Sequence, residues 1–320
     1  MTKRTTTRLA ISVRERLLNL SRQRQENYNL ILVRYANERF LFRLSQSPFA
    51  PQFVLKGAIL FAVWGGEPHR PTLDIDLLGF GDNSPEALRA LFATICELPV
   101  VDDGLTFDAH SIRIEDIREA QEYGGKRVAL IARLDTAVIS VQVDIGFGDI
   151  VTPGAVWLTY PTLLSFPEPH LRTYPKESVV AEKLQAMVML GMANSRMKDF
   201  YDLWTLSREY TFESDILIRA IEATFNQRQT VITMPLPLAL TETFAEHPEK
   251  IKQWQAFLNR NKLDIAGVSL GEVVTELREF LLPLWQALAL QQDFRSVWTA
   301  SRSWGLERQS ASYTSDPRDE

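Results

Sequence analysis

The sequence predicts an α+β protein in which a mixed β-sheet with flanking helices is followed by a helical domain. Strand-like runs of alternating apolar residues cover about 105–117, 127–134 and 137–146. Asp135-Thr136 separates the last two runs, which is the spacing of a β-hairpin. From about residue 176 the apolar residues instead recur every three or four positions, as on one face of a helix. The chain therefore divides into a sheet-forming half and a helical half.

The sheet-forming half begins with helical sequence. Ser12 and Glu15 have the spacing of a capping box, and a long helix with a break near 27–29 is expected after them. Ser47-Pro48 ends this helix, because the residue before a proline avoids the helical region. The next expected elements are a short strand at 53–55, a helix at 58–64, a strand at 73–79 and a helix at 85–97 capped by Ser84.

The helical half contains five expected helices, and the last of them begins with a capping box at Ser269 and Glu272. They cover about 176–191, 198–207, 213–225, 248–260 and 269–290. The polar end of the chain has little apolar content and is expected to be mobile. The predicted organisation is a basic helical segment at 1–47, a core at 48–170, a helical domain at 171–300 and a tail at 301–320.

Composition excludes several classes of protein. The 320 residues are 45% hydrophobic and 23% charged, which suits a globular chain. No run approaches 18 apolar residues, and the N-terminus lacks the pattern of a signal peptide, so we expect a cytoplasmic protein without a membrane span. The single Cys96 excludes an intramolecular disulfide and a multi-cysteine zinc site, and its apolar surroundings predict a buried thiol.

Positive charge is concentrated in the first 44 residues. They hold ten lysines and arginines against three acids, a net charge of +7, while the remaining residues carry −12 and bring the total to −5. Such a segment could bind RNA phosphates or an acidic partner. The alternative is a solvated helix face, or contact with the acidic remainder of the same chain.

The sharpest chemical feature is Asp74-Ile75-Asp76. On a strand, side chains two residues apart share one face, so the two carboxylates would lie together, with Cα atoms roughly 6–7 Å apart. Leu73, Ile75 and Leu77 would then face a core. Paired carboxylates repel each other unless a cation lies between them, and Mg²⁺ prefers such oxygen ligands together with substrate phosphates. Two solvated acids on an exposed strand would be the alternative.

Neighbouring segments add candidates for the same site. Lys56-Gly57 lies between a short strand and a helix, where glycine lets the backbone approach a phosphate, and Arg70 could contact a phosphate or brace the turn. Asp144 lies on a second alternating strand between apolar neighbours, so it needs a partner that a shared metal would supply. Asp144 could also act as a general base for an attacking hydroxyl.

The helical half contributes Lys183, on the apolar face of its helix. This side chain could extend to solvent or reach a triphosphate. Asp199 and Asp202, three residues apart, share a face of the following helix. They could pair with Lys198 or Arg196, and Asp199 could alternatively orient Lys183 or approach the metal.

Taken together these motifs resemble the AbiEii/AbiGii-type nucleotidyltransferase toxins of the DNA polymerase β-like superfamily. The resemblance covers roughly residues 50–210. It is carried, in this order, by Val54-Leu-Lys-Gly-Ala58, Arg70-Pro-Thr-Leu-Asp-Ile-Asp-Leu77, Val141-Gln-Val-Asp144, Glu182-Lys183 and Arg196-Met-Lys-Asp-Phe-Tyr-Asp-Leu203. The family turn is often Lys-Gly-Gly, and Ala58 departs from it.

The resemblance implies a nucleotidyltransferase-like core followed by a helical domain, in the toxin of a toxin–antitoxin or phage-defence pair. Related toxins transfer a nucleotide from an NTP to RNA, in some cases to the tRNA 3′ end, and a cognate antitoxin opposes them. The implied metal carboxylates are Asp74 and Asp76, with Asp144 as the later strand acid. Lys183 and Asp199 match essential positions of the helical motifs, and Gly57 belongs to the turn on the phosphate side.

Two other kinds of function remain open at this point. The chain could be a catalytically silent module that binds NTP or RNA, or a nucleotidyltransferase that modifies a small molecule or a protein hydroxyl. Metal-dependent turnover would eliminate the first alternative, and the identity of the labelled acceptor would decide the second.

Overall fold

The computed structural model describes residues 7–117, 124–263, 265, 267–299 and 302–305. The chain forms two compact units. The first covers the chain up to Val179 together with Leu258–Leu263, and the second covers Val180–Phe257 and the remainder from Asp264. The predicted fold class, a mixed sheet with flanking helices followed by helices, is confirmed, and the basic N-terminal segment belongs to the first unit.

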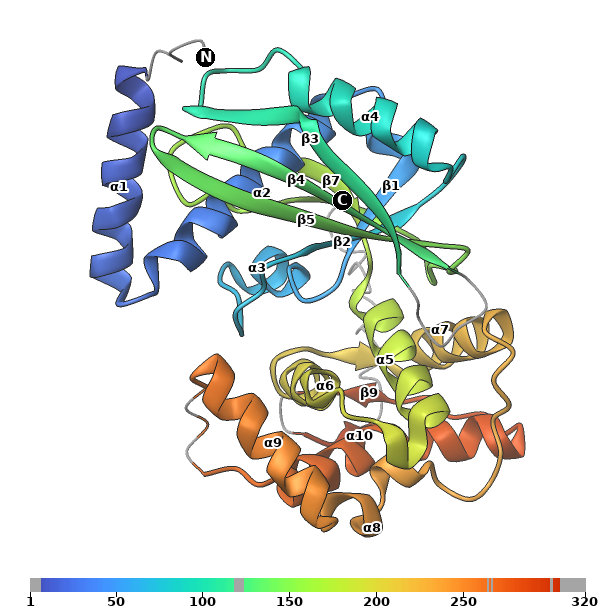
Figure 1. The fold of residues 1–320 in the computed structure, drawn as a ribbon. Coiled ribbons are helices and arrows are strands. Elements are labelled where there is room, and N and C mark those ends of the chain that lie inside the picture. Colours follow the sequence, from blue (N-terminus) through green and yellow to red (C-terminus); the bar gives the residue numbers. More distant parts are fainter. Residues whose placement is uncertain (1–6, 118–123, 264, 266, 300–301, 306–320) are drawn as a thin grey trace, which may run out of the picture. The chain divides into compact units, whose positions relative to one another are not determined.

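The first unit is built on a seven-stranded mixed sheet (Figure 1). Its strands are β1 (Phe53–Lys56), β2 (Ile75–Gly79), β3 (Leu105–Ile117), β4 (Gly125–Leu134), β5 (Ala137–Phe147), β6 (Val156–Thr159) and β7 (His170–Thr173), in the spatial order β3-β4-β5-β2-β1-β7-β6. The β2–β5 and β1–β7 pairs are parallel and the others antiparallel. The hairpin predicted at Asp135-Thr136 is confirmed, because Leu134 pairs with Ala137.

Four α-helices belong to this sheet-containing unit. They are α1 (Arg8–Arg24), α2 (Tyr28–Gln46), α3 (Leu60–Gly65) and α4 (Pro85–Glu97), and a short 3₁₀ helix covers Ala50–Gln52. The break predicted near 27–29 is present, with Asn27 capping α2, whereas the first cap is Thr7 and not Ser12. The aromatic ring of Phe92 from α4 lies 5.6 Å from Phe40 of α2 and 6.4 Å from Phe53 of β1, so both helices bury apolar faces on the sheet.

The second unit is mainly helical. It holds most of α5 (Lys176–Leu190), then α6 (Met197–Glu209), α7 (Ser214–Gln227), α8 (Glu242–Ala245), most of α9 (Pro248–Asn261) and α10 (Leu270–Leu290), with 3₁₀ helices at Gly191–Ala193 and Leu238–Leu240. The capping box predicted for α10 is confirmed. A three-stranded sheet, which the sequence did not indicate, joins β8 (Phe212–Glu213), β9 (Val297–Trp298) and β10 (Trp304–Gly305). Of the predicted tail, residues 301 and 306–320 lie outside the described residues.

Part of the positive charge of residues 1–44 is paired with acids from the rest of the chain. Five arginines of this segment pair with acids: Arg14 with Asp135, Arg24 and Arg34 with Glu67, and Arg39 and Arg43 with Asp103. Arg8, Arg16 and Arg22 are exposed on α1, while Lys3 and Arg4 lie outside the described residues. The contact with the acidic remainder of the chain, weighed above as the alternative to RNA binding, is therefore present.

The buried part of this charge lies on α2. The carboxylate of Asp103 accepts hydrogen bonds from both Nη atoms of Arg43, at 2.7 and 3.1 Å, and one from Nε of Arg39 at 3.2 Å. Glu38 accepts from the backbone of Leu163 at 2.7 Å and from Arg39. These side chains are almost fully buried, so the loss of any one of them would leave a buried charge without its partner. The network therefore stabilises the packing of α2 only while all of its members are present.

Glu38 should make the stability of the protein depend on pH. Burial raises the pKa of Glu38 from 4.5 to about 7, against the opposing effect of the Leu163 and Arg39 contacts. The folded state therefore binds more protons than the unfolded state between pH 4.5 and 7. This one group should lower the free energy of unfolding by about 3 kcal/mol as the pH rises through that window.

Urea denaturation at pH 5 and pH 8 measures this dependence. Glu38→Gln should remove most of the decrease, while Glu97→Gln, at an exposed position of the same unit, should retain it. A Glu38→Gln protein that loses as much stability as wild type between the two pH values would contradict the assignment.

Candidate active site

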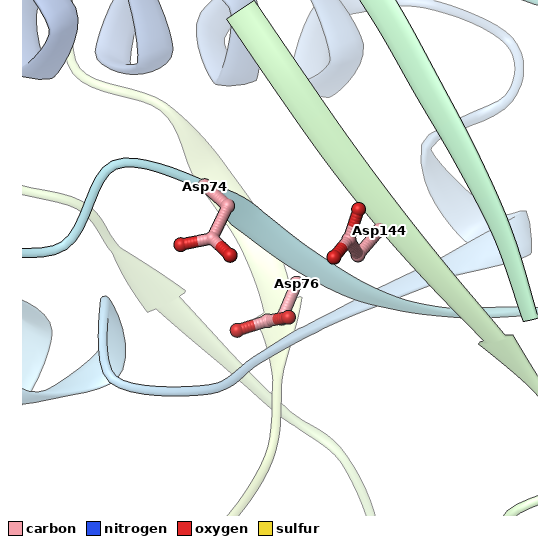
Figure 2. Close-up of side chains that lie close together, drawn as sticks. All are labelled: Asp74, Asp76 and Asp144. Carbon is pink, nitrogen blue, oxygen red and sulfur yellow. The ribbon is translucent and has the colours of Figure 1, made fainter. Parts of the chain in front are cut away.

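Three carboxylates meet on one face of the large sheet. Asp76 on β2 is the register partner of Asp144 on the parallel strand β5, and Asp74 immediately precedes β2. Their side chains point toward one another (Figure 2), and one oxygen from each lies within 4.8 Å of the others. The prediction that these three residues come together is confirmed.

The sequence around β2 explains this placement. Ile75 and Leu77 alternate with Asp76 and are buried on the opposite face, as predicted. Leu73 was expected to join them, but its side chain is 53% exposed because the strand begins only at Ile75. The alternation thus applies within the strand and not to the residues before it.

Gly57 is packed directly against this carboxylate cluster. It follows β1, whose last residue Lys56 pairs with Asp76 across the antiparallel strands. Its φ is +80°, a conformation that side chains rarely adopt, and a Cβ atom built at Gly57 would lie 2.1 Å from Oδ2 of Asp76. Two independent constraints therefore require glycine here, and the second, the space that Asp76 occupies, could not be read from the sequence.

The residues predicted to contact phosphate lie in different surroundings. Nζ of Lys56 lies 2.9 Å from the carboxylate of Asp149 and 5.5 Å from the ring of Tyr174. Arg70 lies half-buried in the bend before β2. Ala58, at the position where the family often has glycine, is 4% exposed and belongs to the core.

Arg127 is the charged neighbour that sequence reasoning missed. It lies on β4 opposite Asp144, and its Nε and Nη2 donate to the two carboxylate oxygens of Asp144 at 2.8 and 2.7 Å. This double hydrogen bond raises the pKa of Arg127. The signal was present: a two-residue turn at Asp135-Thr136 pairs Leu134 with Ala137, and counting seven residues back along each strand pairs Arg127 with Asp144.

Lys183 forms a second charged cluster, in the helical unit. Its ammonium group on α5 donates to Asp199 at 2.8 Å and to Asp202 at 2.7 Å, and Nε of Arg196 donates to the other oxygen of Asp199 at 2.7 Å. Both aspartates are fully buried and Lys183 is 13% exposed. Burial alone would raise the pKa of Asp199, but the charges of Lys183 and Arg196 outweigh it and lower that pKa. Of the alternatives given above, both the pairing of Asp199 with Arg196 and the contact by which Asp199 would orient Lys183 are present.

The donor set of the three-aspartate cluster fits a divalent cation. The set consists of three carboxylates, one of which, Asp144, also pairs with the guanidinium of Arg127. Oxygen ligands at this spacing suit a hard divalent ion such as Mg²⁺ or Mn²⁺. Within the described residues, no other group of three or more histidines, cysteines or acids is close enough to bind a metal. Cys96 is buried, which raises its pKa to about 12 and makes the thiol inert.

Comparison with known proteins places this arrangement among the nucleotidyltransferases. Residues 39–272 match the family described as "Nucleotidyl transferase AbiEii toxin, Type IV TA system". The chain belongs to this family of nucleotidyltransferase toxins, which confirms the resemblance, and the matched range includes both charged clusters. No curated protein matches the chain.

Two solved structures show a more distant likeness. One is "Crystal structure of putative nucleotidyltransferase from H. pylori", with a TM-score of 0.45, 14% identity and coverage of 90% of this chain and 100% of the other. The other is "Crystal structure of JHP933 from Helicobacter pylori", with a TM-score of 0.44, 14% identity and coverage of 90% and 96%. In the described part of the chain, no helix has the length and apolar character needed to cross a membrane.

Proposed function

We propose that this nucleotidyltransferase uses Mg²⁺ to transfer a nucleotidyl group from an NTP to RNA, with the tRNA 3′ end as the acceptor to test first. The observation that carries the proposal is the approach of Asp74, Asp76 and Asp144 to within 4.8 Å in a chain of this family. The substrates NTP and tRNA imply action in the cytoplasm, where a cognate antitoxin would oppose the toxin.

The carboxylates have distinct tasks in this proposal. Asp74 and Asp76 would hold the ion, which when bound neutralises charge on the transferring phosphate and lowers the pKa of the attacking hydroxyl. That hydroxyl oxygen attacks the α-phosphorus, the bond to pyrophosphate breaks, and pyrophosphate leaves. Asp144 would complete the ion's ligands or accept the proton of the hydroxyl.

The remaining candidates would bind the triphosphate. Gly57 presents backbone close to Asp76, and Arg70 lies in the bend before β2, so both are candidates for contacts with phosphate. Lys56 would reach a phosphate only by exchanging its ion pair with Asp149. Lys183 is the candidate charge of the helical unit, and Asp199 would hold its ammonium group in place.

Labelling decides both the reaction and the acceptor. Purified protein is incubated with each of the four α-labelled NTPs, Mg²⁺ and separate pools of tRNA, other RNA, protein and small molecules. Wild type should label tRNA, and mass spectrometry should find the added nucleotide at its 3′ end. Asp74→Ala should reduce labelling by at least about 10³-fold, because the ion would lose a ligand.

Asp116→Ala is the matched control, since this carboxylate is 76% exposed on β3 and, one residue along from Glu115, projects to the opposite face of the sheet from Glu115 and its cross-strand partners. It should label like wild type. Equal labelling by Asp74→Ala and wild type would refute the reaction, and labelling confined to protein or small molecules would refute the RNA acceptor.

A further inference from the structure

Arg127 lies in a row of charged residues across the sheet. Register places Glu115 of β3, Arg127 of β4, Asp144 of β5 and Asp76 of β2 side by side. Cross-strand partners project their side chains to the same face. Arg127 thus has one carboxylate neighbour on each side, and among the residues that the structure describes only Asp144 forms a hydrogen bond with it.

The pairing of Arg127 competes with metal binding. Both oxygens of Asp144 accept hydrogen bonds from the guanidinium, in the parallel double arrangement that arginine and carboxylate favour. Mg²⁺ binds carboxylate oxygens at about 2.0–2.1 Å. It cannot use a lone pair of Asp144 that already accepts a hydrogen bond from the guanidinium. The positive charge of Arg127 also repels the ion. Both effects act in the same direction, against metal affinity.

Arg127 has a second position available. Its side chain is 41% exposed, whereas that of Asp144 is 16% exposed, so the guanidinium can move without opening the core. Glu115, its other cross-strand partner, is exposed, and its charge also acts on Arg127. A guanidinium that leaves Asp144 therefore has a carboxylate within reach on the adjacent strand.

We propose that Arg127 is an exchangeable internal cation, which holds Asp144 when the metal is absent and moves to Glu115 when a divalent ion binds. The inference rests on the proposed metal-binding role of the three aspartates. Arg127 is a positioning residue: it prevents the carboxylates from repelling one another in the metal-free protein, and it lowers the affinity for the ion.

Direct titration of the full-length protein with Mn²⁺ tests the exchange, with free Mn²⁺ measured by electron paramagnetic resonance. Arg127→Gln should bind Mn²⁺ about tenfold more tightly than wild type, which corresponds to ~1.4 kcal/mol. Glu115→Gln should bind less tightly than wild type, because the displaced guanidinium loses its second partner. Arg127→Lys, which keeps the charge without the double hydrogen bond, should fall between wild type and Arg127→Gln.

Arg133→Gln is the matched control. It removes the same charge from the same strand at a position roughly 20 Å from Arg127. At that separation salt largely screens the interaction of an exposed charge with the metal site. Its affinity should equal that of wild type. Unchanged or weaker Mn²⁺ binding by both Arg127 variants would overturn the proposal, as would a Glu115→Gln affinity equal to that of wild type.

The two proposals fail in different ways. Asp76→Asn should abolish Mn²⁺ binding if the carboxylates hold the ion. If Asp76→Asn binds as well as wild type, the metal site itself is wrong. If Asp76→Asn loses binding while Arg127→Gln matches wild type, only the exchange is wrong.

Discussion

Gly57→Ala should lose at least about 10²-fold in nucleotidyl transfer, the effect expected when a reacting group is displaced by about 1 Å. The new Cβ would lie 2.1 Å from Oδ2 of Asp76, so the Asp76 carboxylate has to leave its present position beside Asp74 and Asp144. The alanine would also adopt a positive φ, which costs about 1 kcal/mol of stability. Activity per folded molecule and Mn²⁺ affinity, measured together, should both fall.

Gly66→Ala separates the contact with Asp76 from the backbone strain. Gly66 has a φ of +82°, almost the same as that of Gly57, but its Cβ would meet no atom within 4 Å. Gly66→Ala should therefore lose similar stability and retain metal binding and activity. Similar losses of activity in the two variants would show that strain, and not the packing of Gly57 on Asp76, explains the requirement for glycine.

Lys183→Met should damage both stability and activity. It leaves Asp199 and Asp202, which are fully buried, without the ammonium group that they share, and loss of one partner of a buried ion pair destabilises by about 3–5 kcal/mol. If Lys183 also binds the triphosphate, transfer by the remaining folded protein should fall by about 10²–10³-fold. Calorimetry measures the first effect, and KM and kcat at a temperature where the variant is folded measure the second.

Two variants distinguish these roles. Lys198→Met, at an exposed position of α6, should change neither stability nor activity. Asp202→Asn removes one of the two carboxylates and leaves Lys183 held by Asp199. It should lose stability with a much smaller loss of activity. Full activity in folded Lys183→Met would assign this lysine a purely structural role.

The sequence pattern predicted those elements of the fold that are determined by residues close together along the chain. The hairpin at Asp135-Thr136 and the helix from Pro85 to Glu97 are confirmed, since turn spacing and an N-cap act over a few residues. The short strands β6 and β7 were missed. Each has only four residues, and β7 pairs with β1 from more than a hundred positions away along the chain, so alternation alone gave no signal.

The candidate site shows the same distinction. Its acids were found because Asp74 and Asp76 are two residues apart and Asp144 lies on an alternating strand, although Asp74 itself lies in a bend just before β2. The pairing of Lys56 with Asp149, and the space between Gly57 and Asp76, depend on tertiary packing that no spacing encodes. The charge of residues 1–44 was read correctly as an excess, but its partners, such as Asp103, come from distant segments.

The order of strands in the large sheet has a consequence during translation. Asp76 and Asp144 become neighbours only when β5 adds in parallel beside β2, after the whole β3–β4 excursion has been synthesised. A nascent chain that has not yet released β5 from the ribosome holds two of the three aspartates and no complete cluster. Under the proposed function, a chain that ends before Asp144 would lack one of the three carboxylates that hold the ion, so nucleotidyl transfer would require at least the completion of β5.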